Sequence, residues 1–103
     1  MTPREFFEGL ETRADGAKLA GLDHSYRFEI EGEGTWSVRV GGGRVVVTEG
    51  GEGDRADATI RTSADVFEQL VAGRQNPATA YMTGKVKIDG DLGAVMKLQR
   101  LFG

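Results

Sequence analysis

Cysteine is absent from the 103 residues, and histidine occurs once, at His24. Without thiols the chain cannot form a disulfide framework, a thiolate metal site or a cysteine nucleophile. One imidazole cannot build a histidine-rich metal site or supply two members of a histidine relay. Proline is also scarce, with two residues, whereas glycine occurs 16 times. We therefore expect no metal site, and we expect glycine to form most of the turns.

Long apolar runs and an excess of positive charge are also missing. No segment approaches the roughly 20 apolar residues of a membrane-spanning helix, and a net charge of −3 lacks the basic footprint of a nucleic-acid-binding protein. Residues 1–5 lack the basic and apolar regions of a secretory signal, and residues 101–103 are not a peroxisomal Ser-Lys-Leu tripeptide. These absences predict a cytoplasmic protein with no membrane span and no nucleic-acid partner.

The remaining composition is that of an ordinary globular protein. Hydrophobic residues make up 39% of the chain and charged residues 28%, which excludes wholesale disorder. The length is close to the commonest size of a single domain, and no internal repeat or low-complexity linker interrupts the chain. We therefore expect residues 1–103 to form one domain.

Four segments carry the signals of amphipathic helices. Each begins with a capping residue or a capping box and continues with apolar residues three and four positions apart. Proline occupies the first helical position of two of them, and a glycine ends each of the first three. The predicted helices are residues 3–15, which begin in the capping box Thr2 to Glu5; a segment capped by Thr62 or Ser63 that contains Val66, Phe67, Leu70 and Val71; a short segment after Asn76; and residues 92–102, capped by Asp91.

Five segments alternate apolar and polar residues, which is typical of half-buried strands. Glycine-rich turns separate the first three, so these predict an antiparallel meander. Residues 49–57 are too polar to pack and should form an exposed loop. Strands with one polar face and separate amphipathic helices indicate an α+β fold in which helices cover one side of the sheet. The predicted strands are residues 24–31, 36–40, 44–48, 58–62 and 85–89.

Motifs that would indicate catalysis or cofactor binding do not occur. The glycines lack the spacing of a dinucleotide or phosphate cradle. The acidic pairs Glu29/Glu31 and Asp89/Asp91 fit a solvated strand face and a helix cap better than acid–base catalysis. His24 has no serine or carboxylate motif around it, so no nucleophile–base pair is present. The sequence therefore predicts no catalytic residue and no cofactor.

The last predicted helix carries more apolar surface than one packing partner needs. Its apolar residues span an arc of roughly 220°, against the roughly 100° that suffices for docking on a core, and the side chains of Lys97 and Arg100 occupy the remaining side. Gln99 falls inside it. Either the helix is buried on several sides and Gln99 bonds to the backbone, or its second apolar side lines a cavity for an apolar ligand whose polar end meets Gln99. Met82 and Met96 would suit such a cavity, because thioethers adapt to irregular shapes.

The stretch from Asn76 to Phe102 resembles the C-terminal signature of the sterol carrier protein 2 (SCP2) domain family. The shared features are an Asn-Pro pair, an alanine–aromatic pair, Gly-Lys-x-Lys-Ile, a further glycine and a Met-Lys-Leu-Gln helix. Upstream, the aromatic strand that ends at Gly32, Trp36 in the next strand and Ala-Thr-Ile in the fourth are also similar. The resemblance covers about residues 6–102.

The resemblance implies a five-stranded mixed sheet with helices on one face and an apolar tunnel between the sheet and the helices. It also implies non-catalytic binding or transfer of apolar lipids of the sterol, fatty acid or fatty acyl-CoA type, without a cofactor. The absence of a peroxisomal tail indicates a free-standing, prokaryotic-type member. The candidate ligand-binding residues are Phe67, Leu70, Tyr81, Met82, Leu92, Val95, Met96, Leu98, Gln99 and Phe102, with Gln99 as the polar anchor.

Two alternatives to a lipid carrier stay open. The excess apolar surface could dock a second copy of the chain or a lipid-handling enzyme, which would make the chain an accessory module. The second alternative is a small enzyme that acts on a hydrophobic substrate. It would need an acid or base in its pocket, and no charged residue lies on a predicted core-facing stripe.

Overall fold

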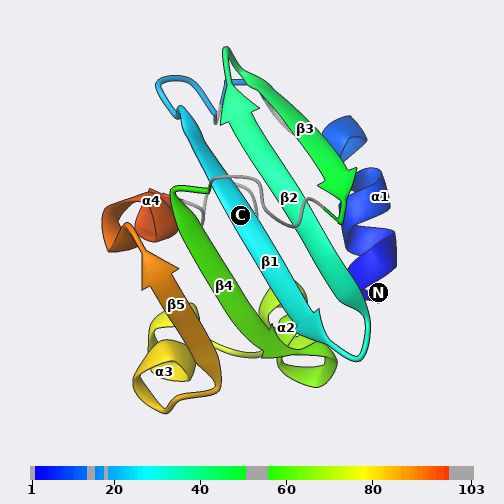
Figure 1. Cartoon of the computed structure of the whole chain (residues 1–103), viewed down its shortest axis with the longest axis vertical. Helices are drawn as coiled ribbons and strands as arrows, with labels where there is room; N and C mark the ends of the chain where they lie inside the picture. The colour runs from blue at the N-terminus through cyan, green and yellow to red at the C-terminus, as the bar shows by residue number, and fades with distance from the viewer. Residues whose placement is uncertain (1, 14–15, 18, 51–55, 98–103) are drawn as a thin grey trace.

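The computed structural model of the chain describes residues 2–13, 16–17, 19–50 and 56–97. Its elements follow the predicted order (Figure 1). The predicted ends of the first and last helices, residues 14–15 and 98–102, lie outside the described residues. The helices are α1 (Pro3–Arg13), α2 (Ala64–Val71), α3 (Pro77–Met82) and α4 (Leu92–Lys97), and the strands are β1 (His24–Glu31), β2 (Gly34–Gly41), β3 (Arg44–Glu49), β4 (Ala58–Ser63) and β5 (Val86–Gly90).

The strands of the described chain form one mixed sheet in the order β3-β2-β1-β4-β5. β1, β2 and β3 pair antiparallel, which confirms the predicted meander. β4 runs parallel to β1, and β5 pairs antiparallel with β4. The turn between β2 and β3 is formed by Gly42 and Gly43, whose φ angles of 59° and 75° are those of a type I′ hairpin. Because β4 pairs with β1, the later strands extend the sheet on the side away from β3.

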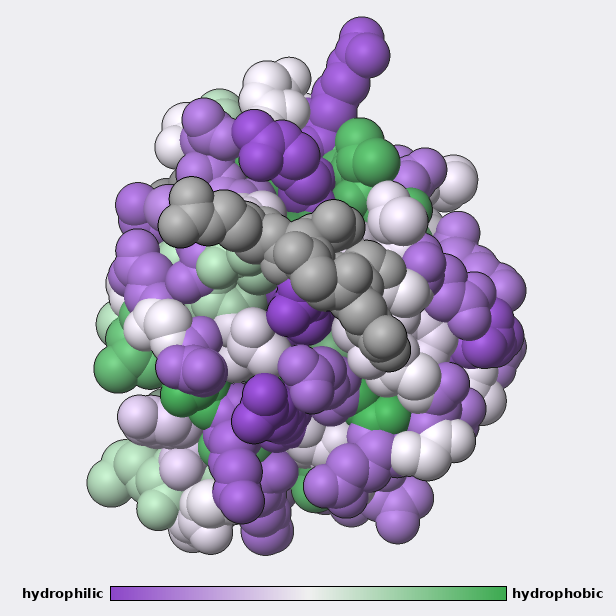
Figure 2. Space-filling model, viewed as in Figure 1, coloured by the Kyte–Doolittle hydropathy of each residue, from purple (hydrophilic) through white to green (hydrophobic). Residues whose placement is uncertain are grey.

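The helices of the described chain lie on one face of the sheet, behind it in Figure 1, as predicted. The period-two pattern of the strands explains this arrangement: Tyr26, Phe28 and Ile30 of β1 are buried on the helix side, and the residues between them face the other way. That outer face is mostly hydrophilic (Figure 2). It carries ion pairs such as Arg61 Nε to Glu29 Oε1, 3.1 Å apart. The predicted α+β architecture is therefore confirmed.

The helices begin at the predicted capping residues. The Thr2 hydroxyl accepts a hydrogen bond from the Glu5 N–H, and the Glu5 carboxylate accepts one from the Thr2 N–H, which completes the capping box. Ser63, rather than its neighbour, caps α2. Asn76 and Asp91 accept hydrogen bonds from the first turns of α3 and α4. Among the described residues, no helix is long and apolar enough to cross a membrane.

The segment between β3 and β4 differs from the predicted loop at its first residue, and its two ends are bonded to neighbouring elements. Glu49 is the last residue of β3, and its carboxylate accepts two hydrogen bonds from the Arg4 guanidinium of α1, each 2.9 Å long. Asp57 accepts a hydrogen bond from the Ser25 N–H and donates its own N–H to the Ser25 carbonyl, both at 2.8 Å. Both ends of the segment are thus fixed to neighbouring elements, and residues 51–55 lie outside the described chain.

The interior between the sheet and the helices has two parts. Under α1 and α2 it is filled by aromatic rings. Phe7 stacks on Trp36 and on Phe67, with ring centroids 4.8 Å and 5.3 Å apart, and Phe28 lies 5.1 Å from Phe7. The other part, between β4, β5 and the later helices, contains a cavity and is the candidate functional site.

Candidate functional site

A cavity of about 260 Å³ lies between the β4–β5 half of the sheet and helices α2, α3 and α4. The inner face of the sheet forms its floor, and the three helices form its walls. The described residues that line it are Phe28, Ile60, Thr62, Val86 and Ile88 from the sheet, Phe67 and Leu70 from α2, Pro77, Ala78 and Tyr81 at α3, and Leu92, Val95 and Met96 from α4.

Aromatic rings close the inner end of the cavity. Phe28 and Phe67 are each 2% exposed, and their ring centroids are 6.2 Å apart. Behind Phe67 the rings of Phe7 and Trp36 stack in turn, so the cavity ends against the filled aromatic cluster. Ile60 pairs with Phe28 across the β1–β4 register and is also buried.

The outer end of the cavity opens between α3 and α4. Tyr81, Leu92 and Met96 line the cavity, yet they are 42%, 46% and 73% exposed. Met82, the last residue of α3, is 83% exposed and does not line the cavity. Among the described residues these are four of the five large hydrophobic side chains that are exposed, and the fifth is Val46 on β3. Apolar side chains gathered around an opening mark a binding site more often than scattered ones do. We call Tyr81, Leu92 and Met96, the three exposed residues of the lining, the rim.

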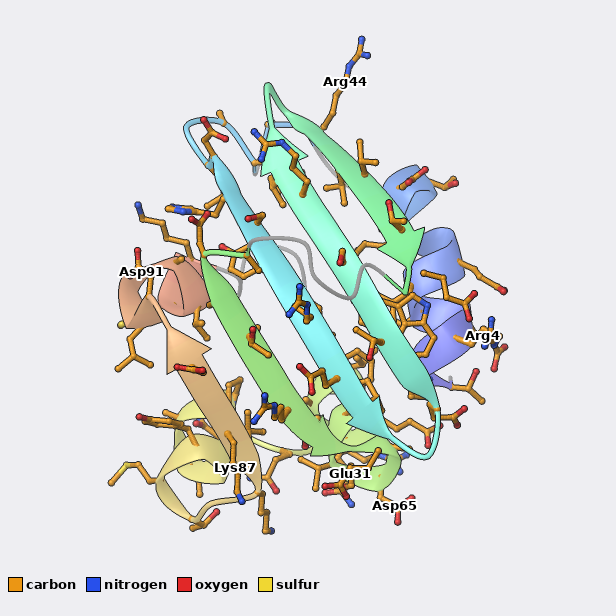
Figure 3. All side chains as sticks on the ribbon, in the orientation of Figure 1. Arg4, Glu31, Arg44, Asp65, Lys87 and Asp91 are labelled. Atoms are coloured by element: carbon orange, nitrogen blue, oxygen red, sulfur yellow. The ribbon has the colours of Figure 1, made fainter. Side chains whose placement is uncertain are left out.

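The cavity wall is apolar. None of its described lining residues carries a charge, and only Thr62 and Tyr81 have polar side-chain atoms. The Thr62 hydroxyl is engaged, because it donates to the Lys85 carbonyl at 3.0 Å. Charged side chains nearby lie elsewhere: Lys87 projects from the outer face of β5, and Asp91 precedes α4 (Figure 3). The described lining therefore offers no carboxylate, imidazole or amine, and the described residues contain no group of three side chains that could hold a metal ion.

The pKa shifts found in the structure belong to residues around α1. Hydrogen bonding between Arg4 and Glu49 lowers the pKa of the Glu49 carboxyl and raises that of the Arg4 guanidinium. Hydrogen bonds from Thr2 lower the pKa of Glu5. These shifts accompany a capping box and an exposed ion pair, so they indicate structural roles rather than a reactive site.

Helix α4, which forms one side of the mouth, is fixed to the sheet by polar contacts. The phenol of Tyr26 is fully buried and donates to the Ala94 carbonyl at 2.6 Å. The Asp91 N–H donates to the Asp57 carbonyl at 2.8 Å. Gly90 permits this approach: its φ is 109°, and a Cβ there would lie 2.5 Å from the Asp57 oxygen. The position of the α4 wall therefore depends on β1 and β4.

His24 has a carboxylate neighbour, contrary to the sequence analysis. Its Nδ1 lies 3.5 Å from Oδ2 of Asp57, the oxygen that also accepts from the Ser25 N–H. The sequence missed this contact because it joins the starts of two strands that are distant along the chain. The Ser25 hydroxyl accepts from the Asp57 N–H at 3.2 Å, so these residues do not form a nucleophile–base chain. They join β1 to β4.

The structure brings together six of the ten predicted ligand-binding residues. Phe67, Leu70, Tyr81, Leu92, Val95 and Met96 all line the cavity. Met82 does not line it and is exposed instead, because it follows Tyr81 and is turned about 100° around the helix. Leu98, Gln99 and Phe102, including the predicted polar anchor, lie outside the described residues.

The sequence analysis missed the floor of the cavity. The floor is formed by residues on the predicted apolar strand faces that were not among the candidate ligand-binding residues: Phe28, Ile60, Val86 and Ile88. Alternation assigns a side chain to a face of the sheet, but it does not say whether the space above that face is filled. Identification of the floor requires the parallel pairing of β4 with β1. No local sequence pattern indicates that pairing.

Comparisons with known proteins agree with this fold. The profile of the SCP-2 sterol transfer family matches residues 5–103. Hydroxysteroid dehydrogenase-like protein 2 of Xenopus tropicalis is 28% identical over 102 residues, which are 97% of this chain and 24% of that protein. Sterol carrier protein 2 of Bos taurus is 41% identical over 69 residues, 67% of this chain and 12% of that protein. The solved structure of the sec-alkylsulfatase Pisa1 from Pseudomonas sp. matches with 29% identity and a TM-score of 0.84, and covers 100% of this chain and 16% of the enzyme.

The chain spans a quarter or less of the length of each of these three proteins. Most of the length of each of these proteins therefore lies outside the region that this chain matches. The family profile, in contrast, covers nearly the whole chain. The chain belongs to the SCP-2 sterol transfer family, which makes binding of apolar lipids its general function.

Proposed function

We propose that the chain is a non-catalytic lipid-binding domain that holds an apolar lipid in the cavity between β4, β5 and helices α2 to α4. The observation that carries the proposal is the cavity itself: about 260 Å³, closed by aromatic rings at one end and open between α3 and α4, with no charged residue in its described lining. Family membership supports the same general function. The ligand classes proposed are sterols, fatty acids and fatty acyl-CoA.

The hydrophobic effect can supply the affinity. Burial of ten methylene groups at about 0.8 kcal/mol each gives on the order of 8 kcal/mol before the costs of association. Micromolar binding or somewhat tighter is therefore expected. The ligand-contacting residues in this proposal are the six predicted residues that line the cavity, together with Phe28, Ile60, Val86 and Ile88. Contacts from Leu98, Gln99 and Phe102 stay predictions.

Titration with a fluorescent acyl chain tests the proposal. We expect saturable binding of one chain per protein that an unlabelled fatty acid displaces. Val95→Trp places an indole into the cavity from α4 and should weaken binding at least about tenfold. Val46→Trp is the matched control, because Val46 is exposed on β3 and does not line the cavity. Absence of saturable binding across several lipid classes, or equal loss in both variants, contradicts the proposal.

A second candidate function is that of an accessory module in a lipid-handling enzyme. Two observations favour it: the hydroxysteroid dehydrogenase-like protein and the alkylsulfatase carry this region as a quarter or less of their length, and the rim exposes three large apolar side chains. In this case the rim would be covered by an enzyme or a second copy of the chain. A mass that rises with protein concentration in sedimentation, without saturable lipid binding, would select this function over the carrier.

A further inference from the structure

We propose that Met96 is a modification site for hydroperoxides: its oxidation to the sulfoxide weakens lipid binding, and a bound lipid shields it from oxidation. The inference rests on the proposed function, since it requires a lipid in the cavity, and it adds a redox chemistry that lipid binding does not itself imply. It follows from the amino-acid composition, the exposure of Met96 and its place in the cavity wall.

In the absence of thiols, thioethers are the side chains of this chain that a peroxide oxidises most readily. The sequence contains three methionines, one tryptophan and no cysteine. Trp36 is 2% exposed and stacks on Phe7, so it is shielded from solvent. Met1 lies outside the described residues. The other two methionines, Met82 and Met96, are 83% and 73% exposed, and a peroxide in solution can therefore reach them.

The two exposed thioethers differ in their place relative to the cavity. Met96, on α4, is part of its lining and of the rim, beside the apolar side chains of Leu92 and Val95. Met82, the last residue of α3, does not line the cavity. The same chemical change at the two sulfur atoms should therefore have different consequences. At Met96 it alters the cavity wall, whereas at Met82 it alters only the surface of the protein.

The reaction is a two-electron transfer of oxygen. A lone pair of the Met96 sulfur attacks one oxygen of hydrogen peroxide, so that an S–O bond forms and the O–O bond breaks. The departing oxygen takes the proton of the attacked oxygen and leaves as water. The sulfur is oxidised by two electrons and the peroxide is reduced by two; an organic hydroperoxide leaves as the alcohol instead. The sulfoxide is polar, and its desolvation beneath a bound lipid is unfavourable.

Occupancy of the cavity controls access to Met96. The cavity opens between α3 and α4, which lie behind β5 toward its two ends (Figure 1). A lipid in this opening covers the side of Met96 that faces the cavity and keeps peroxide away from it. Met82 lies off the cavity and keeps its exposure in both states. The empty domain is therefore oxidised at Met96 faster than the loaded domain, and Met82 serves as an internal reference.

Peptide mass spectrometry after timed exposure to hydrogen peroxide tests the shielding. Trypsin separates Met1, Met82 and Met96 into three peptides, because lysine or arginine lies between them. Without lipid, Met82 and Met96 should be oxidised at rates within about threefold of each other. Saturating dodecanoate should slow the oxidation of Met96 at least about threefold and change that of Met82 by less than about 1.5-fold. Oxidation of Met96 that is not slowed, or that is slowed equally at Met82, overturns the inference.

Lipid affinity before and after oxidation provides the second test. The fluorescent acyl chain should bind the oxidised wild type at least about threefold more weakly than the unoxidised protein, and a methionine sulfoxide reductase should restore the affinity. Met82→Leu should show the same loss on oxidation. In Met96→Leu, oxidation should leave the affinity of that variant where it started. Met96→Gln, which is polar without any peroxide, should bind more weakly than Met96→Leu, and thermal unfolding checks that both are folded.

The outcomes separate this inference from the proposed function. Unchanged lipid affinity in a wild-type protein whose Met96 is fully oxidised overturns the inference alone. So does an equal loss of affinity on oxidation in Met96→Leu, because that loss would come from another residue. Absence of saturable lipid binding before any peroxide is added overturns the proposed function and the inference with it.

Discussion

Removal of the Tyr26 hydroxyl tests how the outer wall of the cavity is held. The phenol is fully buried and donates to the Ala94 carbonyl of α4 at 2.6 Å. Tyr26→Phe keeps the ring but leaves that carbonyl without this donor. Loss of a buried hydrogen bond costs about 1–2 kcal/mol, which in a domain of this size lowers the melting temperature by roughly 5–10 °C. Urea unfolding gives the free energy, and hydrogen exchange should show faster exchange in α4.

Tyr81→Phe is the matched control for this experiment. It removes the same hydroxyl from a side chain that is 42% exposed, so the free energy of unfolding should change by less than about 0.5 kcal/mol. Equal losses of stability in the two variants would refute the reasoning. So would a Tyr26→Phe protein that unfolds at the wild-type urea concentration with unchanged exchange in α4.

Two further predictions concern the backbone at α4 and the surface of α1. Gly90→Ala should lower the free energy of unfolding by about 3 kcal/mol or more, because φ is 109° and the new Cβ would lie 2.5 Å from the Asp57 carbonyl oxygen. The control Gly84→Ala, with φ 79° and open space around it, should lower it by only about 1 kcal/mol. Equal losses in urea unfolding would contradict the close approach at Gly90. The hydrogen bond from Arg4 lowers the pKa of Glu49 below its ordinary value of 4.5, so its stabilising effect is present above that pH and is lost as the pH falls through the lowered pKa. The stability difference between the wild type and Glu49→Gln, followed by thermal unfolding from neutral to acid pH, should therefore shrink on acidification, and a difference that grows would contradict the assignment.

The sequence predicts most of the fold because the signals for its elements are local. The alternation in β1, the glycine pair at Gly42 and Gly43, and the caps at Ser63 and Asn76 each depend on a few neighbouring residues. The β3–β4 connection was predicted less well. Glu49 belongs to β3 because it is the register partner of Trp36 in β2, and the polarity of the segment could not indicate that the strand continues to this residue.

The candidate site could be predicted only in part for the same reason. Leu92, Val95 and Met96, which lie on the wide apolar arc of the last predicted helix, line the cavity, and their contact with a ligand stays a prediction. Its floor required knowledge that β4 lies beside β1 and β5 beside β4, which is long-range information. The anchor between Tyr26 and Ala94 joins residues 68 positions apart, and a tyrosine in an alternating strand carries no signal of its hydrogen-bond partner.

Mapping of bound lipid by heteronuclear NMR tests the central claim most directly. Dodecanoate is added to isotope-labelled protein, and the backbone amide and methyl shifts are followed to saturation. Shift changes should concentrate on cavity residues such as Ile60, Leu70 and Val95 and should be small at Val46 and along the outer face of the sheet. Val95→Trp should suppress them. Saturable changes that centre on the outer face of the sheet, or no saturable changes at all, would contradict a lipid-binding cavity between β4, β5 and helices α2 to α4.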